Sequence, residues 1–446
     1  MKKYTIMHFR EFIEKLEREN KILRIKKEVS TEYEISSLMR VFDGKPILFE
    51  NVSGYDMKIA ANIFSSRKLL AEALEIDEKD LLKKLIFAIE NPKKPEIKKN
   101  KEYKKIKSLN DLPILKHYPK DGGKYISSSV IVAFDKEYGL NASYHRMMVI
   151  DENKVVMRIL PRDFNLYIER GLKEFAICVG NPASVAISAA ISMSPDVDEL
   201  AIANSLYPIN LIEIHNHIVP EAEIIMIAEL TGEMHDEGPF LDLTETFDIV
   251  RKERVARIKR IYARDNAIYH ALLPGGLEHK VLMGLPKEPT IYKEVSKVCD
   301  VVDVYITPGG CSWLHGVVSI RKKSEEDGKK AIEAAFRGHK SMKHVFVVDE
   351  DIDVHDWSQV EWAMATRFQG NKDMVLKYEN LEFLTASEAI EKYQPIGEID
   401  VYEFSTVSWA DMERDVSAWL GNKMQQIAFE EVKNLEKMVK SINNEN

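Results

Sequence analysis

The central part of the chain places the strongest limit on the possible folds. From residue 127 to residue 273 the sequence consists mainly of short runs that are β-branched or that alternate apolar and polar residues, as strands do. The expected strands are 127–134, 140–150, 154–160, 175–179, 209–218 and 222–230, with a hairpin over 257–263 and 267–273. A helix of small residues is expected over 182–193. So many strands in about 150 residues predict a sandwich or a barrel.

Helices and strands alternate on both sides of this central part. Phe9, Phe12, Ile13 and Leu16 recur at helical spacing near the N-terminus. Beyond residue 290 the expected helices are 290–298, 325–337 and 357–367, and the expected strands are 301–306, 316–320 and 344–348. An amphipathic helix over 424–441, packed on another domain or subunit, is expected near the C-terminus. We therefore predict the α/β (α+β) class, with domains at 1–110, 111–290 and 291–446.

Composition argues against several classes of protein. The 446 residues suffice for two or three domains of roughly 150 residues each. A net charge of −9 argues against nucleic acid as the main partner, so the lysine-rich stretch 93–107 is interpreted as a solvated connection. Cys178, Cys299 and Cys311 form no CxxC pair, which fits a reducing cytoplasm. We expect neither a signal peptide nor a membrane span.

Several familiar catalytic motifs are missing from the sequence. It contains no GxGxxG fingerprint, no GxxxxGKS/T phosphate loop, no GxSxG nucleophile elbow and no HExxH zinc motif. A conventional oxidoreductase, kinase, lipase or zinc peptidase is therefore not supported. The chemistry must come from polar residues that are dispersed along the chain.

One predicted strand carries an unusual set of polar side chains. Asn141, Ser143 and His145 would share one face of it, and Arg146 would point to the other face unless the strand is bulged. A buried polar group without a partner costs about 1–3 kcal/mol, so a strand this polar needs a reason. It either faces solvent or lines a site.

Two further segments supply oxygen ligands. Asp163 ends the turn 161–163, and Glu199 lies in an acidic segment that is typical of a helix N-terminus. Together with Asn141 these side chains make a set suited to Mg²⁺ or Mn²⁺. Sequence spacing alone cannot bring them together.

The segment 237–242 places two carboxylates on either side of a Gly-Pro turn. Near an arginine, one of a pair such as Glu237 and Asp242 can stay ionised while the other carries a proton. An ordinary surface turn is the alternative interpretation of this segment.

Two other classes of function remain open at this point. His215 and His217 face the same way on a strand, with Glu221 and Glu223 downstream, so a metal-dependent hydrolase is one alternative. A non-catalytic assembly protein that uses the lysine-rich stretch and the C-terminal helix is another. Near the C-terminal end, Trp362 is expected in the core.

Six short motifs, taken in order, resemble the UbiD family of decarboxylases over nearly the whole chain. They are Asn141-x4-Arg146, Pro161-Arg162-Asp163, Asp198-Glu199-Leu200, Glu237-Gly-Pro-Phe-Leu-Asp242, Thr307-Pro-Gly-Gly310, and Asp349-Glu-Asp-Ile-Asp353 followed by Trp362-Ala-x-Ala-Thr-Arg367. The resemblance implies an N-terminal α/β domain, a split β-barrel flavin domain and a C-terminal α/β domain. It also implies prenylated FMN as cofactor, with a divalent cation (Mn²⁺ or Mg²⁺) and a potassium ion at its phosphate.

The same resemblance implies roles for single residues. The metal ligands would be Asn141, Asp163 and Glu199, and the cofactor would also contact Ser143, His145, Arg146, Arg162, Ser192 and Met193. Arg146, Glu237 and Asp242 match the family's catalytic network, in which the arginine orients the substrate carboxylate, one acid holds the arginine and the other protonates carbon. Asp163 replaces a histidine of better-known members, which favours harder cations. Asp242 replaces a longer glutamate, so either the substrate lies closer or a water intervenes.

The form of these motifs looks most like an archaeal branch of the family. That branch is associated with decarboxylation of trans-anhydromevalonate 5-phosphate to isopentenyl phosphate, a step of isoprenoid biosynthesis. A hydroxybenzoate or another aromatic acid is the alternative substrate. The expected partners are an unsaturated carboxylic acid, a flavin prenyltransferase that supplies the cofactor, and further copies of the chain in a dimer or hexamer, all in the cytoplasm.

Overall fold

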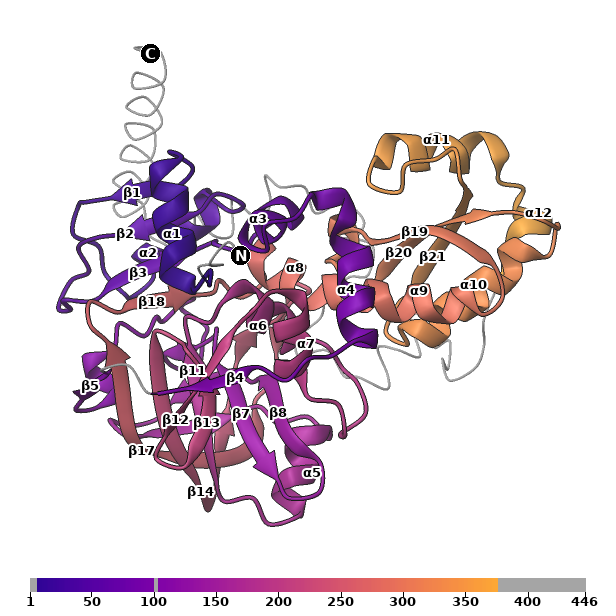
Figure 1. Ribbon diagram of the computed structural model, residues 1–446. Coiled ribbons are helices and arrows are strands. Elements are labelled where there is room, and N and C mark those ends of the chain that lie inside the picture. The colour runs from indigo at the N-terminus through magenta and orange to yellow at the C-terminus, as the bar shows by residue number, and fades with distance from the viewer. Residues whose placement is uncertain (1–5, 100–102, 376–446) are drawn as a thin grey trace, which may run out of the picture. The chain divides into compact units, whose positions relative to one another are not determined.

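The computed structural model describes residues 6–99 and 103–375, so the helix expected over 424–441 lies outside the described residues. The described residues fold into five β-sheets and the helices that connect their strands (Figure 1). The lysine-rich stretch contributes two strands, β4 (Glu96–Lys98) and β5 (Tyr103–Ile106), which pair with the central part of the chain. It is therefore more ordered than the expected connection.

The N-terminal part is an α/β layer. Its helices are α1 (Phe9–Arg18), α2 (Glu34–Val41), α3 (Arg67–Ala73) and α4 (Leu81–Glu90), with the 3-10 turn η1 (Glu78–Asp80) before α4. Its sheet has the order β1 (Leu23–Ile25), β2 (Ile47–Phe49), β3 (Lys58–Ala61) and β18 (Ile268–Ala271). Because β18 runs parallel to β3, the hairpin expected over 257–263 and 267–273 is wrong. Its second arm completes the N-terminal sheet instead.

The central part is built on a nine-stranded sheet, which carries the candidate site. The order is β6 (Tyr125–Ile126), β9 (Met147–Val149), β10 (Lys154–Met157), β17 (Arg251–Arg264), β14 (Ile224–Glu237), β11 (Glu174–Val179), β7 (Val130–Asp135) and β8 (Gly139–Tyr144), with β5 beside β17. The same region holds the 3-10 turn η2 (Leu109–Asp111) and the helices α5 (Asp163–Glu169), α6 (Ala183–Ser188) and α7 (Glu199–Leu206). The helix of small residues is thus shorter than the expected 182–193.

Strand β14 is buried on both faces over its first half. Ile224, Met226 and Ala228 pack into one core cluster, while Ile225 and Ile227 pack into another. Successive side chains of a strand point to opposite faces, so an uninterrupted apolar run suits a strand between two cores. Beyond it, Met234 is exposed and Glu237 is buried again. The strand therefore runs from the core to the site.

Turns divide two of the expected strands. The run 209–218 becomes β12 (Asn210–Ile214) and β13 (His217–Pro220), because His215 and Asn216 both have positive φ and form a tight turn. The run 140–150 becomes β8 and β9, with His145 and Arg146 in the break between them. Because Arg146 lies outside both strands, its side chain does not have to follow the alternation of side chains between the two faces of the sheet.

The C-terminal part is a second α/β layer. Its strands β19 (Asp300–Ile306), β20 (His315–Arg321) and β21 (His344–Asp349) form one sheet. Val318 packs on the side of α9 (Glu288–Ser296) and α10 (Asp327–Gly338), and Val317 on the side of α11 (Trp357–Arg367) (Figure 1). The remaining elements are α8 (Leu277–Gly284), α12 (Gly370–Asp373) and the 3-10 turns η3 (Leu285–Lys287) and η4 (Pro308–Gly310).

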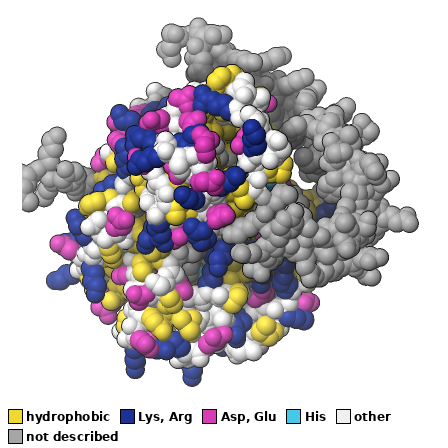
Figure 2. Space-filling model, turned by 90° about the vertical axis from the view of Figure 1, so that its right-hand side faces the viewer, with side chains coloured by type: hydrophobic (Ala, Val, Ile, Leu, Met, Phe, Trp, Pro, Cys, Tyr) yellow, Lys and Arg dark blue, Asp and Glu magenta, His cyan; other side chains and the backbone are white. Residues whose placement is uncertain are grey.

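Two sequence expectations concern the surface. Trp362 is 52% exposed with the Arg367 guanidinium over its ring, so its placement in the core is wrong. Lysine, arginine and acidic side chains are intermixed on the face shown in Figure 2, without an extended basic area. None of the helices in the described ranges has the length and apolar character needed to cross a bilayer.

Candidate active site

Arg146 and Glu237 form the centre of the site. The Nε and Nη2 groups of Arg146 donate to the two carboxylate oxygens of Glu237, each at 2.9 Å. Glu237 is 0% exposed and also accepts a hydrogen bond from the Tyr125 hydroxyl at 3.1 Å. Burial alone would lower the pKa of Arg146, but the hydrogen bonds and negative charges of Glu237 and Asp248 outweigh burial and raise that pKa. Arg146 is therefore a cation in the site. The segments 141–146 and 237–242 therefore meet in space.

The position of Arg146 is set by aromatic and backbone contacts. Its guanidinium lies 4.5 Å from the centre of the Phe240 ring, and that ring packs against Tyr125. The backbone N–H of Gly122 donates to the carbonyl oxygen of Pro239 at 2.9 Å. A Cβ on Gly122 would lie only 2.1 Å from the Gly238 oxygen, so a side chain there is incompatible with this turn.

Asp242 lies in the turn between β15 (Phe240–Leu241) and β16 (Phe247–Asp248). Its backbone N–H donates to the Thr246 oxygen at 2.9 Å, and its Oδ1 accepts from the Leu243 N–H at 2.7 Å. Burial lowers the pKa of the nearby His279 to about 4, although the negative charge of Asp242 acts to raise it. The Gly275 N–H donates to His279 Nδ1 at 3.2 Å, so the neutral ring carries its proton on Nε2.

The expected metal ligands gather at the start of α7. Glu199 is 2% exposed and accepts hydrogen bonds from the Asn141 side-chain amide at 3.2 Å and from the Ala142 N–H at 2.9 Å. Burial raises the Glu199 pKa to about 8, and the nearby carboxylates of Asp163 and Asp198 raise it further. Over residues 6–99 and 103–375 there is no cluster of three His, Cys, Asp or Glu side chains suited to a metal, so the set would rely on the Asn141 amide as its third member.

Ser143 and His145 continue the polar strand beside Asn141. The Ser143 hydroxyl lies 3.1 Å from Asn141 Oδ1 and 3.2 Å from His145 Nε2. His145 Nδ1 lies 3.0 Å from the Arg158 carbonyl oxygen, which requires a proton on Nδ1. Burial lowers the His145 pKa to about 4, so the ring is neutral at pH 7.

Two cations meet on the hydroxyl of Ser192. Arg162 Nη1 donates to it at 3.1 Å and Lys287 Nζ at 3.0 Å. Lys287 is 7% exposed, and burial together with the Arg162 charge lowers its pKa to about 8. Its ammonium also lies 5.3 Å from the centre of the Trp313 ring, and Met193 packs nearby against the core cluster of Ile187 and Leu285. A buried ammonium and an exposed guanidinium that meet on one neutral hydroxyl suit an anion such as a phosphate.

Sequence reasoning did not single out four residues of this region: Tyr125, Asp248, His279 and Lys287. They come from β6, from β16 and from the consecutive elements α8 and η3. None stands in a motif with recognisable chemistry. Only the tertiary structure places them beside Arg146, Asp242 and Ser192.

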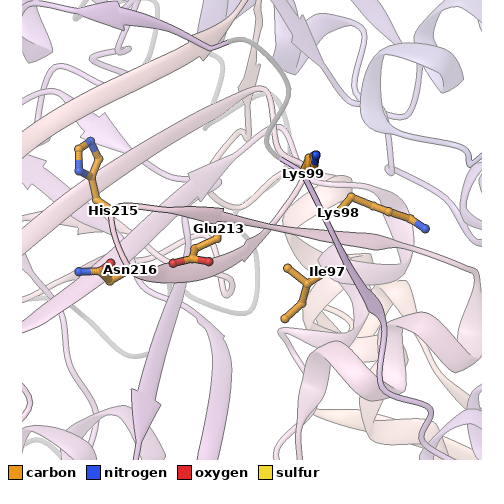
Figure 3. A pocket seen from close by; sticks show the side chains of 6 residues that line it. All are labelled: Ile97, Lys98, Lys99, Glu213, His215 and Asn216. Carbon is orange, nitrogen blue, oxygen red and sulfur yellow. The ribbon is translucent and has the colours of Figure 1, made fainter.

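The alternative histidine site does not assemble. His215 bonds to the Tyr262 hydroxyl, and Glu223 bonds to Arg10 at 2.6 and 2.8 Å. His215 lines a surface hollow with Ile97, Lys98, Lys99, Glu213 and Asn216, and it points away from Glu213 there (Figure 3). Elsewhere, Arg367 of the last motif pairs with Asp351 and Asp349 at the surface.

These residues fit the groups that the motifs imply. Glu199 is a buried acid whose pKa is raised to about 8, so its ionised form would be stabilised by a cation. The donor set of Asn141, Asp163 and Glu199 offers hard oxygens. Lys287 and Arg162 are two cations on one hydroxyl, and a flavin phosphate would fit their charge. The structure therefore has complementary charges for a phosphate and a divalent cation.

The chain matches the domains of one enzyme family over most of its length. Residues 13–89, 90–277 and 280–389 match the N-terminal, Rift-related and C-terminal domains of 3-octaprenyl-4-hydroxybenzoate carboxy-lyase. The anhydromevalonate phosphate decarboxylase of Methanocaldococcus jannaschii is 40% identical over 77% of this chain and 84% of its own length. That of Methanothermobacter thermautotrophicus is 38% identical over 82% of this chain and 90% of its own.

A solved structure extends the likeness to the fold. The UbiD-class enzyme HmfF from Pelotomaculum thermopropionicum, in complex with prFMN, superposes with a TM-score of 0.80 at 30% identity. The match covers 91% of this chain and 99% of that one. The predicted α/β class and three-part architecture are confirmed. The chain belongs to the UbiD family of decarboxylases.

Proposed function

We propose that this protein decarboxylates trans-anhydromevalonate 5-phosphate to isopentenyl phosphate with prenylated FMN as cofactor. The observation that carries the proposal is the buried Arg146–Glu237 pair with Asp242 on the adjoining turn. The choice of substrate is supported by relatives that bear the name anhydromevalonate phosphate decarboxylase and are 35–40% identical to the chain.

The substrate carboxylate binds to Arg146 in this proposal. Glu237 binds Nε and one N–H of Nη2, which fixes the plane of the guanidinium. A second carboxylate would bind at the other edge, formed by Nη1 and the second N–H of Nη2. A pair of hydrogen bonds from an arginine orients a carboxylate more strictly than a lysine could. The bond to be broken would thereby be held in one direction.

Asp242 supplies the proton that replaces carbon dioxide. When bound, prenylated FMN would supply the electron sink for decarboxylation. Asp242 then gives one proton to the carbon that lost the carboxylate and recovers one from water. His279, neutral because burial lowers its pKa to about 4, stays uncharged beside Asp242 through this exchange.

The remaining site residues hold the cofactor. Asn141, Asp163 and Glu199 would bind a Mn²⁺ or Mg²⁺ ion, and Arg162, Ser192 and Lys287 would bind the flavin phosphate. Ser143, His145 and Met193 would contact the flavin. A potassium ion, a homo-oligomeric assembly, a flavin prenyltransferase that supplies the cofactor and a cytoplasmic location belong to the same proposal.

A turnover assay tests the proposal. Protein co-expressed with a flavin prenyltransferase is incubated with trans-anhydromevalonate 5-phosphate, and phosphorus NMR follows the appearance of isopentenyl phosphate. A hydroxybenzoate serves as the competing substrate, because aromatic acids are the alternative. Turnover of the hydroxybenzoate without turnover of the phosphorylated acid would reject the proposed substrate but keep the reaction class.

A further inference from the structure

Arg146 binds a second carboxylate besides Glu237. Its Nη2 donates to Asp248 Oδ2 at 2.9 Å, the same length as its two bonds to Glu237. Asp248 ends strand β16 and stands 102 residues away in the sequence. The position in which a substrate carboxylate could approach Arg146 is therefore partly taken by a carboxylate of the protein itself.

The two carboxylates are held with different firmness. The Glu237 side chain is 0% exposed, whereas that of Asp248 is 19% exposed. Glu237 also lies at the end of a 14-residue strand, while Asp248 belongs to a hairpin whose strands have two residues each. A short, partly exposed hairpin is easier to displace than a buried strand end. Of the two acids, Asp248 is the one that can move.

Arg251 gives Asp248 a second partner. Arg251 Nη1 lies 2.7 Å from Asp248 Oδ1, so Asp248 bridges two guanidinium groups. If Asp248 left Arg146, it would still be paired with Arg251 and would not become an isolated charge. Losing one of two partners costs much less than leaving a carboxylate unpaired.

Charge balance points the same way. Arg146 and Arg251 carry two positive charges, and Glu237 and Asp248 carry two negative charges. A substrate carboxylate would add a third negative charge next to Arg146. Like charges in such a partly buried site repel, so the incoming carboxylate and Asp248 compete for the same guanidinium.

We propose that Asp248 occupies the substrate-carboxylate position on Arg146 in the free protein, and that it leaves Arg146 and keeps only Arg251 as its partner when a carboxylate ligand binds. The inference rests on the proposed function, in which Arg146 receives the substrate carboxylate. Asp248 is thus a positioning residue that sets the affinity for carboxylates. Because Asp242 lies in the turn of the same hairpin, the exchange also couples carboxylate binding to the position of the proton donor.

Binding of a saturated acid tests the exchange without turnover. Calorimetry would measure the affinity of the purified full-length holoenzyme for 3-methylbutanoate, which has no double bond. Asp248→Asn keeps the shape but removes the charge, and we expect it to bind the acid about tenfold more tightly, the effect of removing one partly buried competing charge. Unchanged or weaker binding by this variant would overturn the proposal.

Glu245→Gln is the matched control. Glu245 lies on the same hairpin and also joins two cations, Arg40 and Lys280, but it does not bind Arg146. Its neutralisation should leave the affinity for 3-methylbutanoate unchanged. An equal gain in affinity in both variants would mean that loosening the hairpin, and not competition for Arg146, controls binding, and the proposal would fail.

A double-mutant cycle tests the role of Arg251. Arg251→Ala should weaken binding several-fold in the wild-type background, because Asp248 then has only Arg146 as partner, and should have no effect when Asp248→Asn is already present. Equal weakening in both backgrounds would assign Arg251 to direct binding and overturn its proposed role. Arg146→Lys tests the proposed function separately. If this variant binds 3-methylbutanoate as tightly as wild type, Arg146 does not bind the substrate carboxylate, and that part of the proposed function fails.

Discussion

Arg146 and Glu237 are 91 residues apart in the sequence, yet two hydrogen bonds of 2.9 Å join the guanidinium edge of one to both carboxylate oxygens of the other. The break between β8 and β9 releases Arg146 from the sheet, and the end of β14 presents Glu237 to it. This relationship is the geometric basis of the proposed chemistry, and it can be tested directly.

Arg146→Lys should abolish most of the activity while leaving the protein folded. Lysine keeps a positive charge beside the buried Glu237 but cannot form the paired hydrogen bonds of a guanidinium. We expect kcat/KM to fall by about 100-fold or more in steady-state kinetics, a loss typical of one oriented charged contact. Arg158→Lys is the matched control, because Arg158 pairs with Glu253 on the same sheet but lies outside the proposed network. Equal losses in both variants would contradict the assignment.

Asp242→Asn should remove proton donation and spare substrate binding. The amide has nearly the shape of the acid but cannot deliver a proton to carbon, so kcat should fall by about 10²- to 10⁴-fold with little change in KM. Asp242→Glu should recover part of the rate, since it restores the acid. Asp236→Asn, a change at an exposed acid paired with Lys252, should have no effect. A rise in KM at unchanged kcat would show that Asp242 binds the substrate and does not protonate the product.

Glu199→Gln should have opposite effects on the metal-free and the metal-loaded protein. In the absence of a cation the buried carboxylate costs free energy that a neutral amide avoids, so the variant should melt about 2–4 °C higher than wild type. Addition of Mn²⁺ should raise the melting temperature of wild type only, because a ligand stabilises the state that binds it. Glu169→Gln, the same change at an exposed position of α5, controls for the substitution itself. A Mn²⁺-dependent rise that survives in the Glu199 variant would remove Glu199 from the metal site.

Flavin binding should weaken in alkaline solution because of Lys287. Burial and the Arg162 charge lower the Lys287 pKa to about 8, so in the free protein the ammonium loses its proton as the pH rises through that value. Above pH 8 a phosphate must therefore be bound together with a proton, and the affinity for FMN should fall by up to tenfold per pH unit. Fluorescence titrations with FMN at pH 7 and pH 9 measure this. Lys287→Arg stays charged and should show a flatter profile, whereas parallel profiles for the two proteins would exclude Lys287 as the group that titrates.

Several elements of the fold could be predicted from local patterns, and the errors have definite causes. Phe9, Phe12, Ile13 and Leu16 are all buried, as the helical spacing predicted. The run 267–273 was correctly predicted as a strand but given the wrong partner, because nothing local indicates that β18 pairs with β3, more than 200 residues away. The turn at His215 depends on two residues with positive φ, which residue type alone does not reveal. Trp362 looked like a core residue because of its spacing in a helix, yet it lies at the surface.

Residue types and their order along the chain are enough to propose which side chains form the site. The polar segment 141–146, the acids at Asp163 and Glu199 and the pair in 237–242 were identified by residue type and spacing, and their order indicated the family. The tertiary structure decided which of them meet and what else meets them. Tyr125, Asp248, His279 and Lys287 entered the site only through sheet pairing and helix packing between distant segments. The physical reason is that contacts across tens to hundreds of residues follow from burial of apolar surface on several elements at once, which no single segment encodes.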